Sequence, residues 1–121
     1  MSASLSLSIC ALNVLSLVGD HRVEELEAAA HKVNADIIGL SEVRRPSQAA
    51  IDLNSGMALY HGARDFNRTG GVGFLVSARL SRQVSQFVAL GPRLAFLDVV
   101  LSRCALLRVW VSMHLRVATL W

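Results

Sequence analysis

The chain is 121 residues long, which excludes more than one domain of ordinary size. Hydrophobic residues make up 53% of it and the mean hydropathy is +0.45, so disorder by composition is excluded, yet no run reaches the roughly eighteen consecutive apolar residues of a membrane helix. We therefore expect a soluble domain with no membrane partner, whose net charge of +3 excludes a strongly acidic protein.

The first elements are predicted to be a strand, a helix and a second strand. Residues 5–14 form an apolar, strand-like run with Asn13 near its end. Asp20 suits the N-cap of a helix over about residues 21–33, and Asn34 can close this helix in a left-handed conformation. The apolar run that begins at Ile37 is typical of a strand buried on both faces. The apolar positions of the helix are spaced for one face and are Val23, Leu26, Ala30 and Val33.

Strand, helix and strand at these lengths predict a βαβ unit with two parallel strands. Parallel strands end at the same edge of a sheet, so Asn13 and Glu42, which follow the two apolar runs, are expected to approach each other. An amide beside a carboxylate can hold Mg²⁺, its waters and a phosphate. The alternative for Glu42 is a surface carboxylate paired with Arg44 or Arg45.

The rest of the chain predicts antiparallel strands. Residues 57–60 resemble a short strand, residues 62–71 a loop, and residues 72–77 a strand entered through a hairpin turn rather than a phosphate-cradling loop. Residues 47–55 are a mixed polar stretch, and the tail from residue 114 has no clear pattern. Three further strands are predicted, over residues 84–90, 94–101 and 106–113, the last with alternating apolar and polar positions.

These segments, in this order, resemble the N-terminal half of the endonuclease/exonuclease/phosphatase family. The resemblance is carried by Asn13-Val14-Leu15-Ser16-Leu17, by Asp36-Ile37-Ile38-Gly39-Leu40-Ser41-Glu42-Val43-Arg44 and by Gly71-Val72-Gly73-Phe74, and it covers nearly the whole chain. Within the family, the pattern is most similar to the craniofacial-development-protein-2-like and retrotransposon endonuclease branch. Leu12 stands where that branch often has a tryptophan.

The resemblance implies an α/β fold, namely one half of a four-layered α/β/β/α sandwich with a βαβ unit followed by antiparallel strands. It implies cleavage of phosphodiester bonds with Mg²⁺, or Mn²⁺, by in-line attack of an activated water. Glu42 matches the metal-binding glutamate and Asn13 the asparagine that orders the metal site and the phosphate. His114 stands where the family usually carries a catalytic tyrosine; the alternative is a tail residue with no role.

The second half of the family supplies an Asp-x-Asn pair and a C-terminal Asp-His pair, and neither follows the last predicted strand. We therefore expect this chain to be incomplete and weakly active or inactive. The alternative is a non-catalytic fragment that binds nucleic acid or a protein partner. Without a second sheet, the inner face of the antiparallel strands is expected to be uncovered and to support self-association. This face is formed by Phe87, Leu97, Val99, Val109 and Val111.

The charged residues and cysteines bear on partners and compartment. Eleven of the twelve basic residues are arginines, whose guanidinium groups match phosphate oxygens. This favours a nucleic-acid partner, with coding bias as the alternative, and Arg44 and Arg45 are either phosphate contacts or solvated loop residues. Cys10 and Cys104 lie in apolar, strand-like segments and are predicted to be buried free thiols. Free thiols favour a reducing compartment, so an intracellular location, nuclear or cytoplasmic, is expected.

Overall fold

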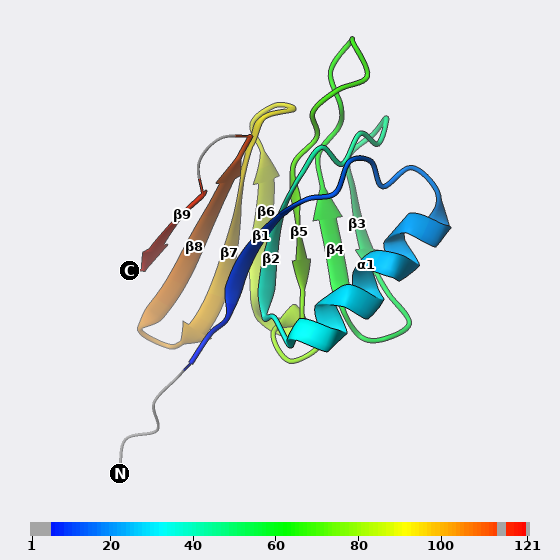
Figure 1. Ribbon diagram of the computed structural model, residues 1–121. Coiled ribbons are helices and arrows are strands. Elements are labelled where there is room, and N and C mark those ends of the chain that lie inside the picture. The colour runs from blue at the N-terminus through cyan, green and yellow to red at the C-terminus, as the bar shows by residue number, and fades with distance from the viewer. Residues whose placement is uncertain (1–5, 114–115, 121) are drawn as a thin grey trace.

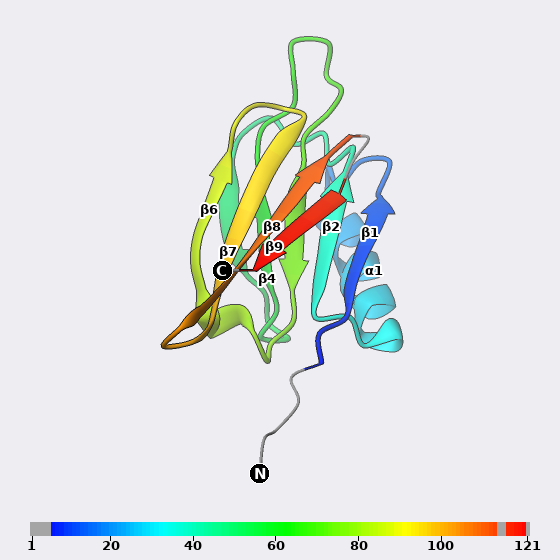
Figure 2. The same cartoon turned by 90° about the vertical axis from the view of Figure 1, so that its left-hand side faces the viewer.

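The computed structural model describes residues 6–113 and 116–120, which form one helix and two stacked β-sheets. The helix lies on the outer face of the first sheet, and the second sheet covers the opposite face (Figures 1 and 2). The fold is therefore α/β, in three layers. Its elements are β1 (Ile9–Asn13), α1 (Asp20–Val33), β2 (Ile37–Ser41), β3 (Ala49–Asp52), β4 (Ala58–His61), β5 (Gly73–Val76), the 3₁₀ turn η1 (Ser81–Gln83), β6 (Val84–Ala89), β7 (Leu94–Ser102), β8 (Ala105–Ser112) and β9 (Arg116–Leu120).

The first sheet has five strands in the order β1-β2-β5-β4-β3. β1 and β2 are parallel and joined through α1, as the βαβ pattern predicts, while the remaining neighbours are antiparallel. All five residues of β2 are buried, which confirms the prediction of a strand covered on both faces. β1 is an edge strand in the described chain, and all of its residues are exposed.

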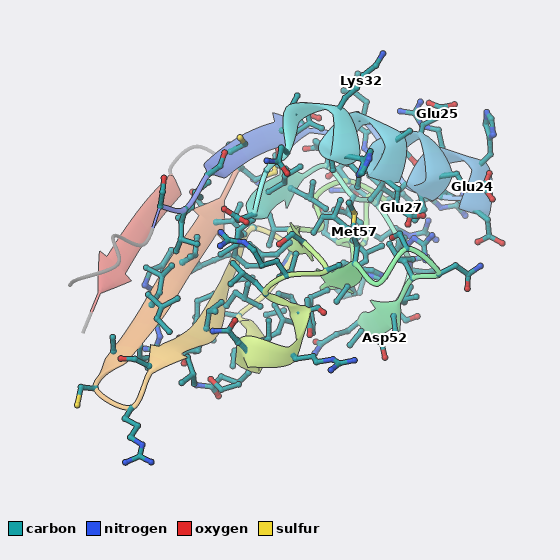
Figure 3. All side chains as sticks on the ribbon, turned by 90° about the horizontal axis from the view of Figure 1, so that it is seen from below. Glu24, Glu25, Glu27, Lys32, Asp52 and Met57 are labelled. Atoms are coloured by element: carbon teal, nitrogen blue, oxygen red, sulfur yellow. The ribbon has the colours of Figure 1, made fainter. Side chains whose placement is uncertain are left out.

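Helix α1 packs one apolar face on the first sheet. Val23, Leu26 and Ala30 are buried there, with Met57 beneath the helix, whereas Glu25 and Lys32 point away from the sheet (Figure 3). Two details of the sequence prediction are wrong: the N-cap is Gly19, with Asp20 as the first helical residue, and Val33 is exposed rather than part of the apolar face. The left-handed Asn34 is confirmed, with φ 53°.

The second sheet contains four antiparallel strands in the order β6-β7-β8-β9. Its inner face packs against β2 and β5, so the expected uncovered face is wrong: Leu97, Val99 and Val111 have no exposed surface, and Val109 is 4% exposed. The covering sheet exists because the β4–β5 hairpin joins β1 and β2 in one sheet. The face that was expected to support self-association is therefore buried inside the protein. A second helical layer is not seen in residues 6–113 and 116–120.

Buried charge on the second sheet is confined to one network in the described residues. Asp98 on β7 is 2% exposed and accepts hydrogen bonds from Nε and Nη2 of Arg108 on β8, at 2.7 and 2.9 Å, and from Gln86 on β6 at 2.6 Å. These bonds hold the pKa of Asp98 below its ordinary value, Arg108 contributing most. The Arg108 guanidinium also lies 4.1 Å from the centre of the Phe96 ring. An ion pair thus links β7 to β8, and a hydrogen bond from Gln86 links β7 to β6.

Several sequence expectations are corrected by the remaining strands and side chains. β3 lies within the stretch that looked mixed and polar, and β9 within the tail that showed no pattern. Cys10 and Cys104 are exposed, the first on edge strand β1 and the second in the β7–β8 turn, so the prediction of buried thiols is wrong.

Candidate functional site

Asn13 and Glu42 lie at the same edge of the first sheet. In the parallel register Asn13 is opposite Ser41, the residue before Glu42. The ladder continues past both strands, because the N–H of Val14 donates to Ser41 O at 3.0 Å and the N–H of Ser16 to Glu42 O at 2.7 Å. We call this edge the carboxyl rim; it comprises the ends of β1, β2 and β4, the start of β5, and connecting segments 14–19, 42–48, 62–72 and 90–93.

The Glu42 carboxylate is buried at this rim and already paired. The residue is 8% exposed, and its Oε2 accepts a hydrogen bond from Nε of Arg44 at 2.8 Å and from the N–H of Gly70 at 3.4 Å. The ion pair with Arg44 is the interaction that the alternative interpretation proposed, although Glu42 is not on the surface. Its second oxygen, Oε1, makes no hydrogen bond within the described chain, which leaves one carboxylate oxygen for a ligand.

Gly70 and Gly71 bring the β4–β5 loop against Glu42. The N–H groups of Val43 and Arg44 each donate to a carbonyl of this pair, at 2.9 Å, and the N–H of Gly71 donates to Pro92 O at 2.7 Å. Both glycines have positive φ, and an added Cβ on Gly71 would lie 3.0 Å from the Arg44 nitrogen. The close approach therefore depends on residues without side chains. The hairpin interpretation of this segment is consistent with the structure, which also places it in contact with β2.

Asn13 is exposed, and its side-chain oxygen is occupied by a local bond. Oδ1 accepts the N–H of Leu15 at 3.0 Å, whereas the amide NH₂ group has no partner in the described chain. A cavity of about 230 Å³ adjoins Asn13. It lies toward α1 and is lined by Arg22, Glu25 and Leu26 among others, but not by Glu42. The two candidate residues thus share a rim but not this cavity.

The backbone around both candidate residues adopts an unusual conformation. Leu15, Ser16, Glu42 and Arg44 all have positive φ, between 53° and 107°. Such conformations cost about 1–3 kcal/mol each for residues with a side chain, and they are concentrated at functional sites in proteins. Neighbouring hydrogen bonds between segments 14–17 and 41–43 hold them in place. The strain is an independent indication that this rim has a function.

Basic side chains gather around the rim from three segments. Segments 42–45, 62–72 and 90–93 contain five arginines and two carboxylates, those of Glu42 and Asp65. The sequence interpretation considered only the adjacent pair in the first segment, because the other three arginines are brought to the rim by the fold. The arginines are Arg44, Arg45, Arg64, Arg68 and Arg93.

Two of these arginines are tied to the backbone of the rim. Arg45 donates from Nε to Leu17 O at 2.9 Å, and Arg64 donates from Nη1 to Arg44 O at 3.3 Å. A third, Arg93, lies 3.6 Å from the Asp65 carboxylate. Arg45 therefore has a structural contact, whereas the sequence interpretation offered only a phosphate contact or a solvated loop residue.

His61, at the end of β4, is a buried histidine that the sequence interpretation missed. It is 1% exposed, and Nδ1 lies 3.2 Å from Gly62 O, while Nε2 has no partner among the described residues. Burial lowers the pKa of His61, with a smaller opposing effect from the Gly62 hydrogen bond and a further lowering by the Arg45 charge. No sequence signal marked it, since histidine is intermediate between the residue types that are mostly buried and those that are mostly exposed.

The protein ligands available for a metal at this rim are few. Residues 6–113 contain no group of three or more His, Cys, Asp or Glu side chains that could hold a metal ion. Glu42 can supply one carboxylate oxygen, and Asn13 only the second lone pair of Oδ1, because this oxygen already accepts the Leu15 N–H and an amide NH₂ group cannot bind a cation. So small a ligand set is compatible with Mg²⁺, because this ion keeps several waters and often uses one or two carboxylates. His114, the third predicted catalytic residue, lies outside the described residues.

Comparisons with known proteins add no assignment. Neither the family models nor the curated proteins that were searched match this chain. Among the described residues, no helix is both long enough and apolar enough to span a membrane.

Proposed function

We propose that this chain carries part of the active site of a metal-dependent phosphodiester hydrolase of the endonuclease type. The observation that supports this best is the parallel register of Asn13 and Ser41, which brings Asn13 and Glu42 to one rim. The similarity to the endonuclease/exonuclease/phosphatase family, in these residues and their order, gives the reaction type. The proposal thus combines the sequence pattern with the position of two side chains.

In this proposal, Glu42 holds the cation and Asn13 orients the phosphate. Bound Mg²⁺ would supply positive charge to the phosphate and to a developing oxyanion. Glu42 presents the unpaired Oε1, and Arg44 gives up Oε2 or remains as a second positive charge beside the phosphate. The free NH₂ group of Asn13 can donate to a phosphate oxygen. Neither residue can orient the attacking water as well, so we expect weak or no turnover from these groups alone.

A second function is favoured by the arginines at the rim. Five guanidinium groups in three neighbouring segments suit binding to a phosphate backbone without cleavage. In this alternative Glu42 only positions Arg44, through their 2.8 Å hydrogen bond. The two functions differ in whether Glu42 binds a divalent cation.

Metal binding and cleavage can be measured with one set of variants. We expect the chain to bind Mn²⁺, detected by electron paramagnetic resonance, and any nicking of supercoiled DNA above background to be weak and to require Mg²⁺ or Mn²⁺. Glu42→Gln should abolish both, whereas Glu24→Gln, an exposed carboxylate on α1 that does not line the cavity beside Asn13, should change neither. Equal Mn²⁺ binding by both variants, with equal nicking in all lanes, would remove the hydrolase proposal and leave the non-catalytic one.

A further inference from the structure

One aromatic side chain at the carboxyl rim is completely exposed. Phe66 lies in the β4–β5 loop and has a relative exposure of 106%, whereas the other exposed large hydrophobic residues range from 38% to 64%. This loop projects beyond the ends of both sheets in Figures 1 and 2. Burying a phenylalanine ring contributes about 1.5–3 kcal/mol to folding, and here the fold gains none of it. The ring is therefore available to a ligand.

The loop that presents Phe66 is held by hydrogen bonds around its neighbour Asp65. The Asp65 carboxylate accepts the N–H groups of Asn67 and Thr69, at 2.9 and 3.0 Å, and the Thr69 hydroxyl at 2.9 Å. Backbone bonds close the same turn, from Asp65 N to Thr69 O and from Arg68 N to Asp65 O. The pKa of Asp65 is lowered from its ordinary value, most of all by the hydrogen bonds from Thr69. Phe66 is thus carried on a closed turn with a defined shape.

Two arginines belong to, or contact, the turn that carries Phe66. Arg68 follows two residues later, is exposed and has φ 61°, and Arg93 reaches the turn through its 3.6 Å contact with Asp65. The end of the loop returns to Glu42, because the N–H of Gly70 donates to its carboxylate. A ligand lying along the rim could therefore contact Phe66, the arginines and Glu42 together.

We infer that Phe66 stacks on a base of an unpaired nucleic-acid strand whose phosphates contact Arg68 and the other rim arginines. Every nucleobase offers a flat face to an aromatic ring, and stacking contributes about 1–3 kcal/mol per base. A base inside a duplex has both faces covered by its neighbours, so the ring favours single-stranded or frayed substrates. A lipid surface fits less well, since Phe66 is followed by polar Asn67 and Thr69 and has no apolar neighbour in the turn. The inference specifies the substrate class of the proposed function and rests on that function only for the neighbourhood of Glu42.

Binding can be measured without catalysis. The probe is a fluorescein-labelled single strand of mixed sequence, with anisotropy recorded in EDTA so that no divalent cation is present. We expect Phe66→Ala to weaken binding roughly fivefold to a hundredfold, Phe66→Trp to retain it, and Arg68→Gln to reduce the dependence of affinity on salt by about one phosphate contact. Val33→Ala, an exposed apolar residue on α1, is the matched control and should bind as the parent chain does. Because the Phe66 ring is fully exposed, Phe66→Ala should melt at the parent temperature.

A strand that carries an abasic site at each position identifies stacking as the cause. The parent chain should bind this strand as weakly as Phe66→Ala binds the normal one. Three results would each overturn the inference. Phe66→Ala could bind the normal strand as tightly as the parent chain does, or the abasic strand could reduce the affinity of Phe66→Ala as much as that of the parent chain. In the third, Phe66→Ala would bind only anionic phospholipid vesicles more weakly, and not the strand. Glu42→Gln separates the two proposals. Both are supported if Glu42→Gln loses Mn²⁺ binding while Phe66→Ala still weakens strand binding in its background. The stacking alone is supported if Phe66→Ala weakens strand binding but the parent chain binds no Mn²⁺.

Discussion

Nε of Arg44 donates to Oε2 of Glu42 at 2.8 Å, so the carboxylate proposed to bind a cation is already neutralised by one. Arg44 therefore competes with a divalent ion, both by occupying Oε2 and by repelling positive charge. We predict that Arg44→Gln raises the affinity for Mn²⁺, by roughly three- to tenfold, measured by calorimetry. Arg79→Gln is the control, because Arg79 forms a similar pair with Asp36 at the opposite end of β2. A lower affinity in Arg44→Gln would show that Arg44 supports the site instead.

The ion pair on the second sheet gives a prediction about stability and pH. Asp98→Asn removes the carboxylate charge from the ion pair with Arg108, and because Asp98 is 2% exposed we expect the free energy of unfolding to fall by about 2–3 kcal/mol at pH 7. The pKa of Asp98 is lowered in the folded protein, so its stabilisation is complete above the unfolded pKa, about 4, and disappears as the pH falls through the lower folded value. Urea denaturation of both proteins should show the difference shrinking below about pH 4. A difference that stays constant to pH 2 would contradict this origin.

Gly73, at the start of β5, leaves no room for a side chain. An added Cβ would overlap the carbonyl oxygen of Tyr60 and lie 2.9 Å from Cα of His61, both on the neighbouring strand β4. Backbone atoms in the centre of a sheet cannot move aside, so we predict that Gly73→Ala lowers the free energy of unfolding by about 3 kcal/mol or more. Gly91→Ala is the matched control: its φ of 137° is strained for alanine, but no atom lies within 4 Å of the new Cβ. Equal losses in thermal denaturation would mean that the overlap at Gly73 costs no more than the backbone strain at Gly91, and would contradict the prediction.

His61 should make the fold less stable in mild acid. Its pKa is lowered by burial, so below about pH 6.5 the unfolded chain binds a proton that the folded protein does not, until the pH reaches the lower folded value. Each group of this kind can reduce stability by up to about 1.4 kcal/mol per pH unit over that range. We predict that the loss of stability between about pH 7 and 5 is smaller in His61→Gln than in the parent chain. Identical slopes in the two proteins would contradict the assignment.

The βαβ unit could be predicted from sequence because its signals are local. A buried apolar run beginning at Ile37, a helix ending at Asn34 and an amphipathic spacing between them determine one parallel pair. Asn13 and Glu42 then follow at one rim from the rule that parallel strands end together. β3 was missed because only part of Ala49–Asp52 is covered, so its residues carry little hydrophobic pattern.

Contacts between distant segments could not be predicted in the same way. The antiparallel strands looked uncovered because pairing of β5 with β2 is not encoded in either strand alone. The arginines of segments 62–72 and 90–93 join the rim only through backbone bonds such as Gly71 N to Pro92 O. The metal-binding role of Glu42 and Asn13 stays a prediction, as do the nucleic-acid partner and the role of His114.

The position of β1 at the edge of its sheet has a consequence for the two halves of the site. Glu42 follows a strand with a neighbour on each side, whereas Asn13 follows one that is held along a single side in the described residues. Amide protons of β1 should exchange with solvent sooner than those of β2, since strand edges open at lower cost than sheet centres. Glu42 would then be the rigid residue of the site and Asn13 the mobile one. A strand that paired with the open edge of β1 would restrict Asn13 and so strengthen its hold on a phosphate.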